Sequence, residues 1–510
     1  MTYEQDASEA LRLSCVEATD RLIDALAVRG FQQVDDVSET WRGVLHIDVD
    51  PDGVDVHTLI DVQIPADYPY AQPKITPLSS AAAMTRAGSD LSRYYEASST
   101  WHREPSGHLC LFEHADHSRL PWADAGDLLE QVQAWLREDR AGWPTGAPAL
   151  DLERYLSSTG EVVLFDDPRS VAGKVVHLKR RGSVWVVDLP AKVPRGRRGV
   201  KARWSPGVAL VLDVGELDRP IRDWPSLLDA AGEQAHHLHR EVASGIRELV
   251  LTYRRGSAAG VLALRLRPTA SGWTVKAHTA APRDTASLTR RAHPKRNILA
   301  QRAITVVGVG AIGSVLTDLL HRSGVGRLHL VDPDIVLPGN VIRHLVGADQ
   351  VGKPKVTAVA HTVRSARPES DQNVTTEHGR ITSLQAARDL FRTCDLVVDA
   401  TADSTASTLI GAAARAGAGR AISVCVLADG YAIRVDHWPE PSTGTLAAPV
   451  LPPVQSGTYE TGCSSPISTT PPAAAWEAAA LGARHAIDVV LGISSRASEQ
   501  RILHAQGTLR

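Results

Sequence analysis

The sequence predicts a multidomain α/β protein whose C-terminal part is a doubly wound parallel sheet. Three observations predict this class. Residues 302–436 alternate short apolar runs with helix-like segments, as parallel strands with crossover helices do. Residues 151–290 contain many strand-like runs and little helix, so a β-rich middle domain is expected. Residues 1–150 combine helices with alternating strands, which predicts an α+β N-terminal domain.

Size and composition restrict the class of protein. The chain has 510 residues, 43% of them hydrophobic and 22% charged, which predicts a soluble globular protein of several domains. A net charge of −3 gives no reason to expect binding to nucleic acid or membranes. No secretion signal and no apolar run of about 18 residues is visible. The five cysteines are dispersed without a C-x-x-C pair, so we expect a cytoplasmic protein without zinc.

The N-terminal domain is predicted element by element. Residues 4–30 suit an amphipathic helix ending at Gly30. Two alternating strands, GVLHIDVD and HTLIDVQI, are joined by a Pro-Asp-Gly turn. A proline-rich extended stretch, IPADYPYAQPKITPL, comes next, and then the loop WHREPSGHLCLF, which carries Cys110. A helix from Leu128 to Leu136 is predicted to complete the domain.

This order of elements resembles the ubiquitin-conjugating enzyme fold over residues 1–150. Asp67 to Ile75, DYPYAQPKI, is similar to the family's Y-P-x-x-P-P-x-I stretch, and His108-Leu109-Cys110-Leu111 is similar to its active site. The resemblance implies that Cys110 forms thioesters, which requires an accessible, activated thiolate. The asparagine that steadies an oxyanion in eukaryotic members is missing here, and the segment after the cysteine looks more like the bacterial branch. His102 is the first choice of helper among the nearby histidines, His108, His114 and His117 being the others.

The middle of the chain gives no functional signal. Runs such as EVVLF, SVWVVDL and ELVLTYRR predict strands, and we assign residues 151–290 to a linker domain of unknown role. The basic segment AKVPRGRRGVKARW is interpreted as a solvated loop, with docking of an acidic protein as the alternative.

A glycine-rich turn organises the last domain, residues 291–510. The run ITVVGV predicts a buried strand, and Gly308, Gly310 and Gly313 then form G-x-G-x-x-G before a helix from Ala311 to Ser323. The N-terminus of such a helix binds phosphate groups. Asp332 follows the next strand, at the spacing typical of a carboxylate that binds ribose. A nucleotide site is therefore predicted at this turn.

Further polar residues follow the strands of this domain. The pattern D-x-D-x-x-x-x-x-N-x-x-R, then G-x-P-K, then D-A-T, between about 302 and 436, resembles the ThiF/MoeB/ubiquitin-activating family, with a Rossmann-like fold. The resemblance implies ATP-dependent adenylation of a protein's C-terminal glycine carboxylate. By position it implies that Gly308, Gly310 and Gly313 line the phosphates and that Asp332 binds ribose. It also implies these roles: Asn340 and Arg343 contacting ATP, Lys355 stabilising phosphate charge, and Asp403, or alternatively Asp399, holding Mg²⁺.

The same resemblance assigns two more features. Cys463 lies in an irregular segment, about 439–472, where activating enzymes carry the cysteine that accepts the acyl group. Family members complete the ATP site with an arginine from a partner subunit, which makes Arg290, Arg291 and Arg296 candidates in a homodimer. His344 stands where many relatives have glutamine.

Together the two resemblances predict one chain that activates and conjugates a protein, as in bacterial fusion proteins of CBASS antiphage operons. The path would run from adenylate to Cys463, to Cys110 and to an amine. The cargo would be the C-terminus of a cyclic-nucleotide synthase (CD-NTase) or another ubiquitin-like protein. Two alternatives remain open: a nicotinamide-dependent oxidoreductase that uses the glycine turn and Asp332, and a scaffold with an inactive conjugating domain.

Overall fold

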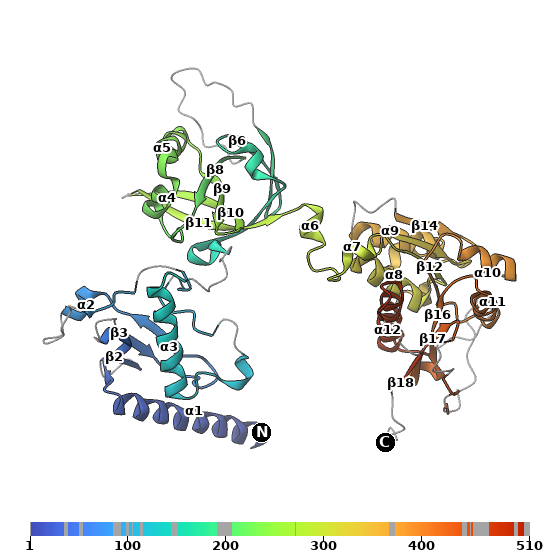
Figure 1. Cartoon of the computed structure of the whole chain (residues 1–510), viewed down its shortest axis with the longest axis horizontal. Helices are drawn as coiled ribbons and strands as arrows, with labels where there is room; N and C mark the ends of the chain where they lie inside the picture. The colour runs from blue at the N-terminus through green and yellow to red at the C-terminus, as the bar shows by residue number, and fades with distance from the viewer. Residues whose placement is uncertain are drawn as a thin grey trace. The chain divides into compact units, whose positions relative to one another are not determined.

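The computed structural model describes residues 2–503 except 35–38, 50–54, 85–92, 98–100, 105, 113–115, 144–150, 191–206, 271, 367–372, 441–445, 449, 452–468 and 494–497. The chain divides into two compact units, Met1–Arg283 and Asp284–Arg510 (Figure 1). Among the helices described, none is both long and apolar enough to cross a membrane. The predicted mixed α/β, multidomain class is confirmed.

The first unit begins with an antiparallel sheet and its helices. The sheet has the order β1-β2-β3-β4. Its strands and the accompanying helices are α1 Thr2–Val28, β1 Gln32–Gln33, β2 Thr40–Val49, β3 Asp55–Gln63, β4 Lys74–Pro77, α2 Ser80–Met84 and α3 Ala125–Arg140. Leu26 of α1, Ile60 of β3 and Leu128 of α3 belong to one buried core, so helices and sheet fold as a single layer pair.

Two hydrogen bonds join the proline-rich stretch to the segment just before α3. The Tyr68 side chain is fully buried, and its hydroxyl donates to the carbonyl oxygen of Ala123 at 2.8 Å. The indole N–H of Trp122 donates in return to the carbonyl oxygen of Pro69 at 2.6 Å. The proline-rich stretch is therefore fixed to the loop that leads into α3, where Asp124 caps the helix.

The rest of the first unit is a closed barrel with the strand order β10-β11-β5-β7-β6-β8-β9. Its elements are η3 Leu152–Tyr155, β5 Ser157–Phe165, β6 Val175–Arg181, β7 Val184–Pro190, β8 Val208–Glu216, α4 Trp224–Ala231, α5 Ala235–Ser244, β9 Glu248–Arg255, β10 Ala258–Thr269 and β11 Gly272–Pro282. The β-rich middle with some helix was predicted. The basic segment 191–204 lies outside the described residues.

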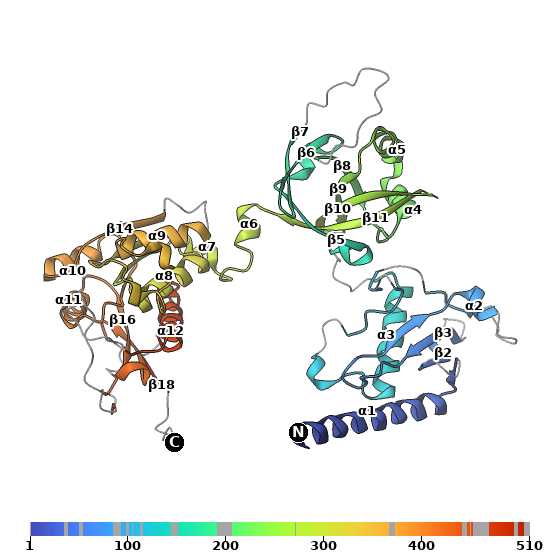
Figure 2. The same ribbon diagram turned by 180° about the vertical axis from the view of Figure 1, so that it is seen from behind.

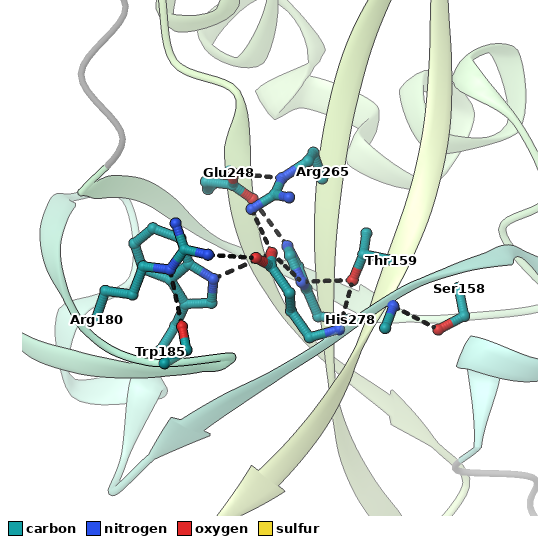
Figure 3. Close-up of polar contacts among 10 residues, drawn as sticks. Ser158, Thr159, Arg180, Trp185, Glu248, Arg265 and His278 are labelled. Carbon is teal, nitrogen blue, oxygen red and sulfur yellow. Dashed lines mark hydrogen bonds and ion pairs between the residues drawn. The ribbon is translucent and has the colours of Figure 1, made fainter.

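A polar network lies beside the apolar cluster that contains Val163 and Val250. Glu161 and Glu248 lie two residues before Val163 and Val250, on the same faces of β5 and β9. Arg265 bridges both carboxylates with nitrogen–oxygen distances of 2.7 Å. His278 contacts Glu248 through Nε2 at 2.9 Å and Thr159 through Nδ1 at 2.8 Å (Figure 3). Each of these buried charges is thus paired, as buried ionic groups must be.

The second unit contains a sheet of order β14-β13-β12-β15-β16-β17-β18, in which β14 to β16 are parallel. Its elements are α6 Thr285–Leu288, α7 Arg296–Leu299, β12 Ala303–Val307, α8 Ala311–Ser323, β13 Arg327–Val331, α9 Lys355–Ala366, β14 Val374–Glu377, α10 Leu384–Leu390, β15 Leu396–Asp399, α11 Ser404–Arg415, β16 Ala421–Leu427, β17 Ala432–Trp438, α12 Pro472–Val490 and β18 Glu499–Ile502.

Helices cover both faces of this sheet. The core that contains Val306 and Val398 includes residues of α8, α9 and α12, whereas the neighbouring Val307 and Val397 pack with α10 and α11. Figures 1 and 2 show α8 and α12 side by side and α10 with α11 away from them. Successive residues of each strand therefore face opposite helical layers, which explains why the strands are apolar throughout.

The last strands depart from the parallel pattern. β16 and β17 pair antiparallel, joined by a tight turn in which Asp429 and Gly430 have φ values of 51° and 102°. β18 then pairs antiparallel with β17. Residues 421–438 thus form a hairpin, because a short loop can join only antiparallel neighbours.

Candidate functional site

The glycine turn between β12 and α8 has different requirements at each glycine. Gly308 has a φ of +82°, and a Cβ atom there would lie 2.7 Å from the backbone of Thr401. A Cβ atom on Gly313 would lie 1.8 Å from the carbonyl oxygen of Gly308, so the helix can approach the strand only without a side chain. Space around Gly310 is open, so this glycine leaves room for a group on its outer side.

Asp332 closes β13 beside this turn. One carboxylate oxygen accepts from the backbone N–H of Val309 at 2.7 Å, and the other accepts from the N–H of Asp334 at 2.8 Å. Burial raises the pKa of Asp332, while the nearby Lys355 ammonium and these two hydrogen bonds act in the opposite direction. The carboxylate therefore fixes the glycine turn, and its remaining lone pairs can accept a ligand hydroxyl.

A cavity of about 480 Å³ opens at the carboxyl ends of the strands. This is the place where doubly wound sheets bind ligands. Of the residues predicted from sequence, Gly308, Asp332, Asn340, Lys355 and Asp403 line it. Gly310, Gly313, Arg343 and Asp399 are not among the lining residues.

Two cationic side chains reach the cavity wall. Lys355 begins α9, and its Nζ lies 2.9 Å from a carboxylate oxygen of Asp334. Arg380, which follows β14, lies with Nη1 3.3 Å from Asp403. Sequence reasoning missed Arg380, although its position just after a strand end was a usable signal. Both side chains therefore place positive charge at the cavity, which favours the binding of phosphate groups.

The two alternative magnesium aspartates differ in their surroundings. Asp399 is buried, and its oxygens accept from the side-chain hydroxyls of Thr401, Ser407 and Ser423 at 2.5–2.9 Å. Asp403 lines the cavity and caps α11 by accepting from the N–H of Thr405 at 2.9 Å. The carboxylate of Asp399 is thus taken up by hydrogen bonds inside the protein, while that of Asp403 lies at the cavity.

Asn340 and Arg343 follow β13 in one irregular segment. Asn340 Oδ1 accepts from the backbone N–H of Leu337 at 3.0 Å, which orients its side chain at the cavity. Arg343 turns to a different partner: its Nη1 donates to the carbonyl oxygen of Thr470 at 3.4 Å, and its own carbonyl accepts from the indole N–H of Trp476. The structure therefore does not bring Arg343 to the cavity lining.

Cys463 lies outside the described residues, but both sides of its segment are held. Arg434 donates to the carbonyl oxygens of Leu446 and Ala447 before it. After it, the N–H of Thr469 donates to Asp429, next to the Thr470 contact with Arg343. The described chain thus resumes at Thr469, and Thr470 contacts Arg343, which lies three residues after Asn340.

The three candidate arginines before β12 differ in solvent exposure. Arg290 and Arg291 are exposed, whereas Arg296 is half-buried at the start of α7 near Gly324. Among the described residues, no group of three or more His, Cys, Asp or Glu side chains is placed to hold a metal ion.

Cys110 lies in a second cavity, of about 590 Å³, in the first unit. The chain doubles back around Gly107, so the Cys110 N–H donates to the carbonyl oxygen of His102 at 2.9 Å. The Cys110 thiol is half-buried, and Arg154 Nη2 lies 3.6 Å from its sulfur. Sequence reasoning missed Arg154, because no local signal links the two positions.

The candidate helper histidines near Cys110 have different surroundings. His102 lines the Cys110 cavity, with its ring 4.2 Å from that of Trp143. His108 bonds Thr76 Oγ1 at 2.8 Å, and burial lowers its pKa. His117 bonds the carbonyl oxygen of Phe112 at 2.9 Å, and His114 lies outside the described residues. His102 alone of the described candidates stays at the cavity.

Known proteins resemble the C-terminal part. The model of the ThiF family matches residues 285–508. Ubiquitin-like modifier-activating enzyme 5 of Culex quinquefasciatus is 41% identical over 86 residues, which cover 17% of this chain and 21% of that protein. The enzyme of the same name from Drosophila ananassae is 35% identical over 121 residues, covering 22% and 31%. The matches thus span less than a third of these relatives' length.

Solved structures give a weaker likeness. E. coli MccB with succinimide matches with a TM-score of 0.31 and 17% identity, over 41% of this chain and 66% of that chain. On the sequence match and the sheet described above, residues 285–508 form a ThiF family domain, homologous to the ubiquitin-like modifier-activating enzymes.

Proposed function

We propose that this chain uses ATP to adenylate the C-terminal glycine carboxylate of a protein, takes the acyl group onto Cys463 as a thioester, and passes it to Cys110 for attachment to an amine. The observation that carries the proposal is the cavity that Gly308, Asp332 and Lys355 share at the carboxyl end of the sheet. The homology of this domain to ubiquitin-like modifier-activating enzymes supports the same chemistry.

In the first step the substrate carboxylate oxygen attacks the α-phosphorus of ATP, and pyrophosphate leaves. Gly308, Gly310, Gly313 and the N-terminus of α8 are proposed to receive the phosphates, with the Asp332 carboxylate on the ribose. Lys355 would neutralise the developing phosphate charge once its contact with Asp334 loosens, with help from Asn340. Arg343 is proposed to contribute only after leaving the carbonyl oxygen of Thr470, since it does not line the cavity in this structure. Asp403 would hold Mg²⁺ together with phosphate oxygens and water, neutralising charge on pyrophosphate.

The acyl acceptor is proposed to be Cys463. Burial raises the pKa of the Cys394 thiol, and it raises that of Cys425 to about 11. Both thiols are thus protonated at neutral pH and poor nucleophiles. The anchored end of the Cys463 segment at Arg343 supports delivery of this thiol to the adenylate. Its attack on the acyl carbon would expel AMP.

Thiol exchange then moves the acyl group to Cys110, whose resemblance to a conjugating-enzyme cysteine and position in an open cavity support the role. The proposed cargo is the C-terminus of a CD-NTase in antiphage defence, with another ubiquitin-like protein as the alternative. We also propose a homodimer in which Arg290, Arg291 or Arg296 crosses to the partner's ATP site.

The test is pyrophosphate exchange into ATP with purified CD-NTase or a ubiquitin-like protein as cargo. Lys355→Ala should lower the exchange rate about 100-fold, since one phosphate cation is removed. Lys353→Ala is the matched control, because Lys353 bonds Gln350 and does not line the cavity. Absence of exchange with every glycine-ended cargo, together with NADH binding, would show an oxidoreductase instead.

The order of the cysteines is tested on non-reducing gels. Cys463→Ala should remove the reducible cargo adduct altogether, whereas Cys110→Ala should leave an adduct on Cys463. Equal adducts in wild type and in the Cys110→Ala variant, with no transfer to amines in either, would show that the conjugating domain is an inactive scaffold.

A further inference from the structure

A cation from the barrel lies at the sulfur of Cys110. Arg154 belongs to η3, the helical turn that opens the barrel, and its Nη2 lies 3.6 Å from Cys110 Sγ. The other guanidinium nitrogen, Nη1, lies 3.5 Å from Asp151 of the same turn. The side chain is only 28% exposed, so solvent screens the contact with the sulfur incompletely.

The barrel also grips the backbone that carries this cysteine. The Tyr155 hydroxyl oxygen accepts from the backbone N–H of His102 at 3.1 Å, and Tyr155 is buried. The preceding residue, Trp101, packs in the barrel's core cluster, and the Arg255 guanidinium lies 3.6 Å from the centre of its ring. Since His102 in turn accepts from the Cys110 N–H, η3 and the cysteine keep a fixed relation.

Other charged groups lie near the thiol. Arg222 lies over the Tyr155 ring at 4.7 Å; burial lowers its pKa, while Tyr155 and Cys110 act in the opposite direction. The cavity wall formed by α3 contributes carboxylates, and the loop contributes an imidazole: Asp127, Glu138 and His102. Among these described groups, Arg154 lies against the sulfur, with Nη2 at 3.6 Å, so Arg154 acts on the thiol directly.

We propose that Arg154 is a catalytic residue of the Cys110 site, which stabilises the thiolate and the oxyanion formed during transfer. This inference rests on the proposed role of Cys110 as a thioester carrier. The middle domain would then complete the conjugating site, where the sequence lacks the asparagine that a conjugating enzyme places near its cysteine.

The transfer step breaks the thioester on Cys110 and forms an amide bond to the amine. The amine nitrogen attacks the thioester carbonyl carbon, and the carbonyl electrons move to oxygen as a tetrahedral oxyanion next to the guanidinium. The carbon–sulfur bond then breaks, its electron pair stays on Cys110 as thiolate, and the amine proton passes to solvent. Arg154 would stabilise negative charge at both stages without accepting or giving a proton.

The test is the pH profile of iodoacetamide alkylation at Cys110 in the full chain, read by mass spectrometry of the Cys110 peptide. Removing an adjacent cation raises a thiol pKa by about one unit or more. Arg154→Gln should therefore slow alkylation about tenfold below the pKa, and Arg154→Lys should restore part of the rate because it keeps the charge. The matched control is Arg119→Gln, since Arg119 pairs with Asp116 in the same i, i+3 manner.

Discharge of the preformed Cys110 thioester to hydroxylamine completes the test. Arg154→Gln should slow discharge at least tenfold, with Arg119→Gln at the wild-type rate. A wild-type chain that forms no thioester on Cys110 refutes the proposed function. Thioester formation with an unchanged alkylation profile in Arg154→Gln refutes the role of Arg154 alone. Equal losses in Arg154→Gln and Arg154→Lys, with unchanged urea unfolding, would show a positional rather than electrostatic contact and also overturn it.

Discussion

His344 Nε2 donates a hydrogen bond to the carbonyl oxygen of Val309 at 2.8 Å. Its Nδ1 accepts from the N–H of Val346 at 3.3 Å, so both ring nitrogens are satisfied in the neutral form. The contact ties the segment of Asn340 to the glycine turn. Burial lowers the pKa of His344 to about 4.

This pKa predicts an acid-sensitive second unit. The histidine pKa is about 6.5 when unfolded and about 4 when folded, so the unfolded chain binds the proton more tightly. The stability linked to the neutral imidazole is present above pH 6.5 and lost as pH falls toward 4, by about 3 kcal/mol. Urea unfolding at pH 7, 5.5 and 4.5 should show a shallower decline for His344→Gln, whose amide can also donate to Val309.

The loss of stability on acidification should become smaller in His344→Gln but should not vanish, because burial also lowers the pKa of His437 to about 4. His361→Gln, at an exposed position of α9, is the control. A decline in His344→Gln as steep as in the wild type would show that this imidazole does not couple to folding.

The glycines of the turn should separate folding from nucleotide binding. Gly313→Ala forces a methyl group against a backbone oxygen that cannot move aside, and it should cost about 2–3 kcal/mol of stability. Gly310→Ala meets open space, so the melting temperature should change little while pyrophosphate exchange falls. Differential scanning calorimetry and exchange assays check both. Equal melting temperatures for the two variants would contradict the close approach of helix and strand.

Local sequence signals located much of the C-terminal fold. The helix 311–323 was predicted with the bounds the structure has, because a glycine turn marks its start and Gly324 its end. The rule that ligand groups follow strands of a parallel sheet placed Asp332 and Asp403 together, and both line one cavity.

Other features depend on contacts far apart in the chain. Arg154 reaches Cys110 across 44 residues, and the barrel pairs β11 with β5, which lies more than 100 residues earlier in the chain. Periodicity shows that a strand is half-buried but not which strand is its neighbour. The sequence also does not show that Asp399 accepts from three hydroxyl groups while Asp403 lines the cavity. Two of these hydroxyls, on Thr401 and Ser407, are close to Asp399 in the chain, but their directions depend on the folded backbone.

The two aspartates should therefore respond differently to replacement by asparagine. Asp399→Asn puts an amide donor against hydroxyl donors in a buried position, which should cost about 2 kcal/mol in urea unfolding. Asp403→Asn keeps a good helix cap, so stability should stay within about 0.5 kcal/mol. Loss of a proposed magnesium ligand should nevertheless lower pyrophosphate exchange at least tenfold and raise the Mg²⁺ concentration needed. Unchanged Mg²⁺ dependence in Asp403→Asn would exclude Asp403 as the metal ligand.

In the barrel, Arg265 and Arg180 share the carboxylate of Glu161, and their replacement should have different effects on stability. Arg265 contacts Glu161 at 2.7 Å and is 15% exposed, whereas Arg180 contacts the other oxygen of Glu161 at 3.4 Å and is 58% exposed (Figure 3). Arg265→Met leaves Glu161 and Glu248 without their shared buried cation, and should destabilise the first unit by about 3–5 kcal/mol.

Arg180→Met removes an exposed partner and should cost less than about 1 kcal/mol. Urea unfolding of the full chain, followed by tryptophan fluorescence, compares the two directly, because Trp185 itself donates to Glu161 at 3.1 Å. Acid should narrow the difference between the variants, since protonation of Glu161 removes a charge that Arg265 balances. Equal losses of stability in both variants would mean that the barrel does not depend on this buried ion pair.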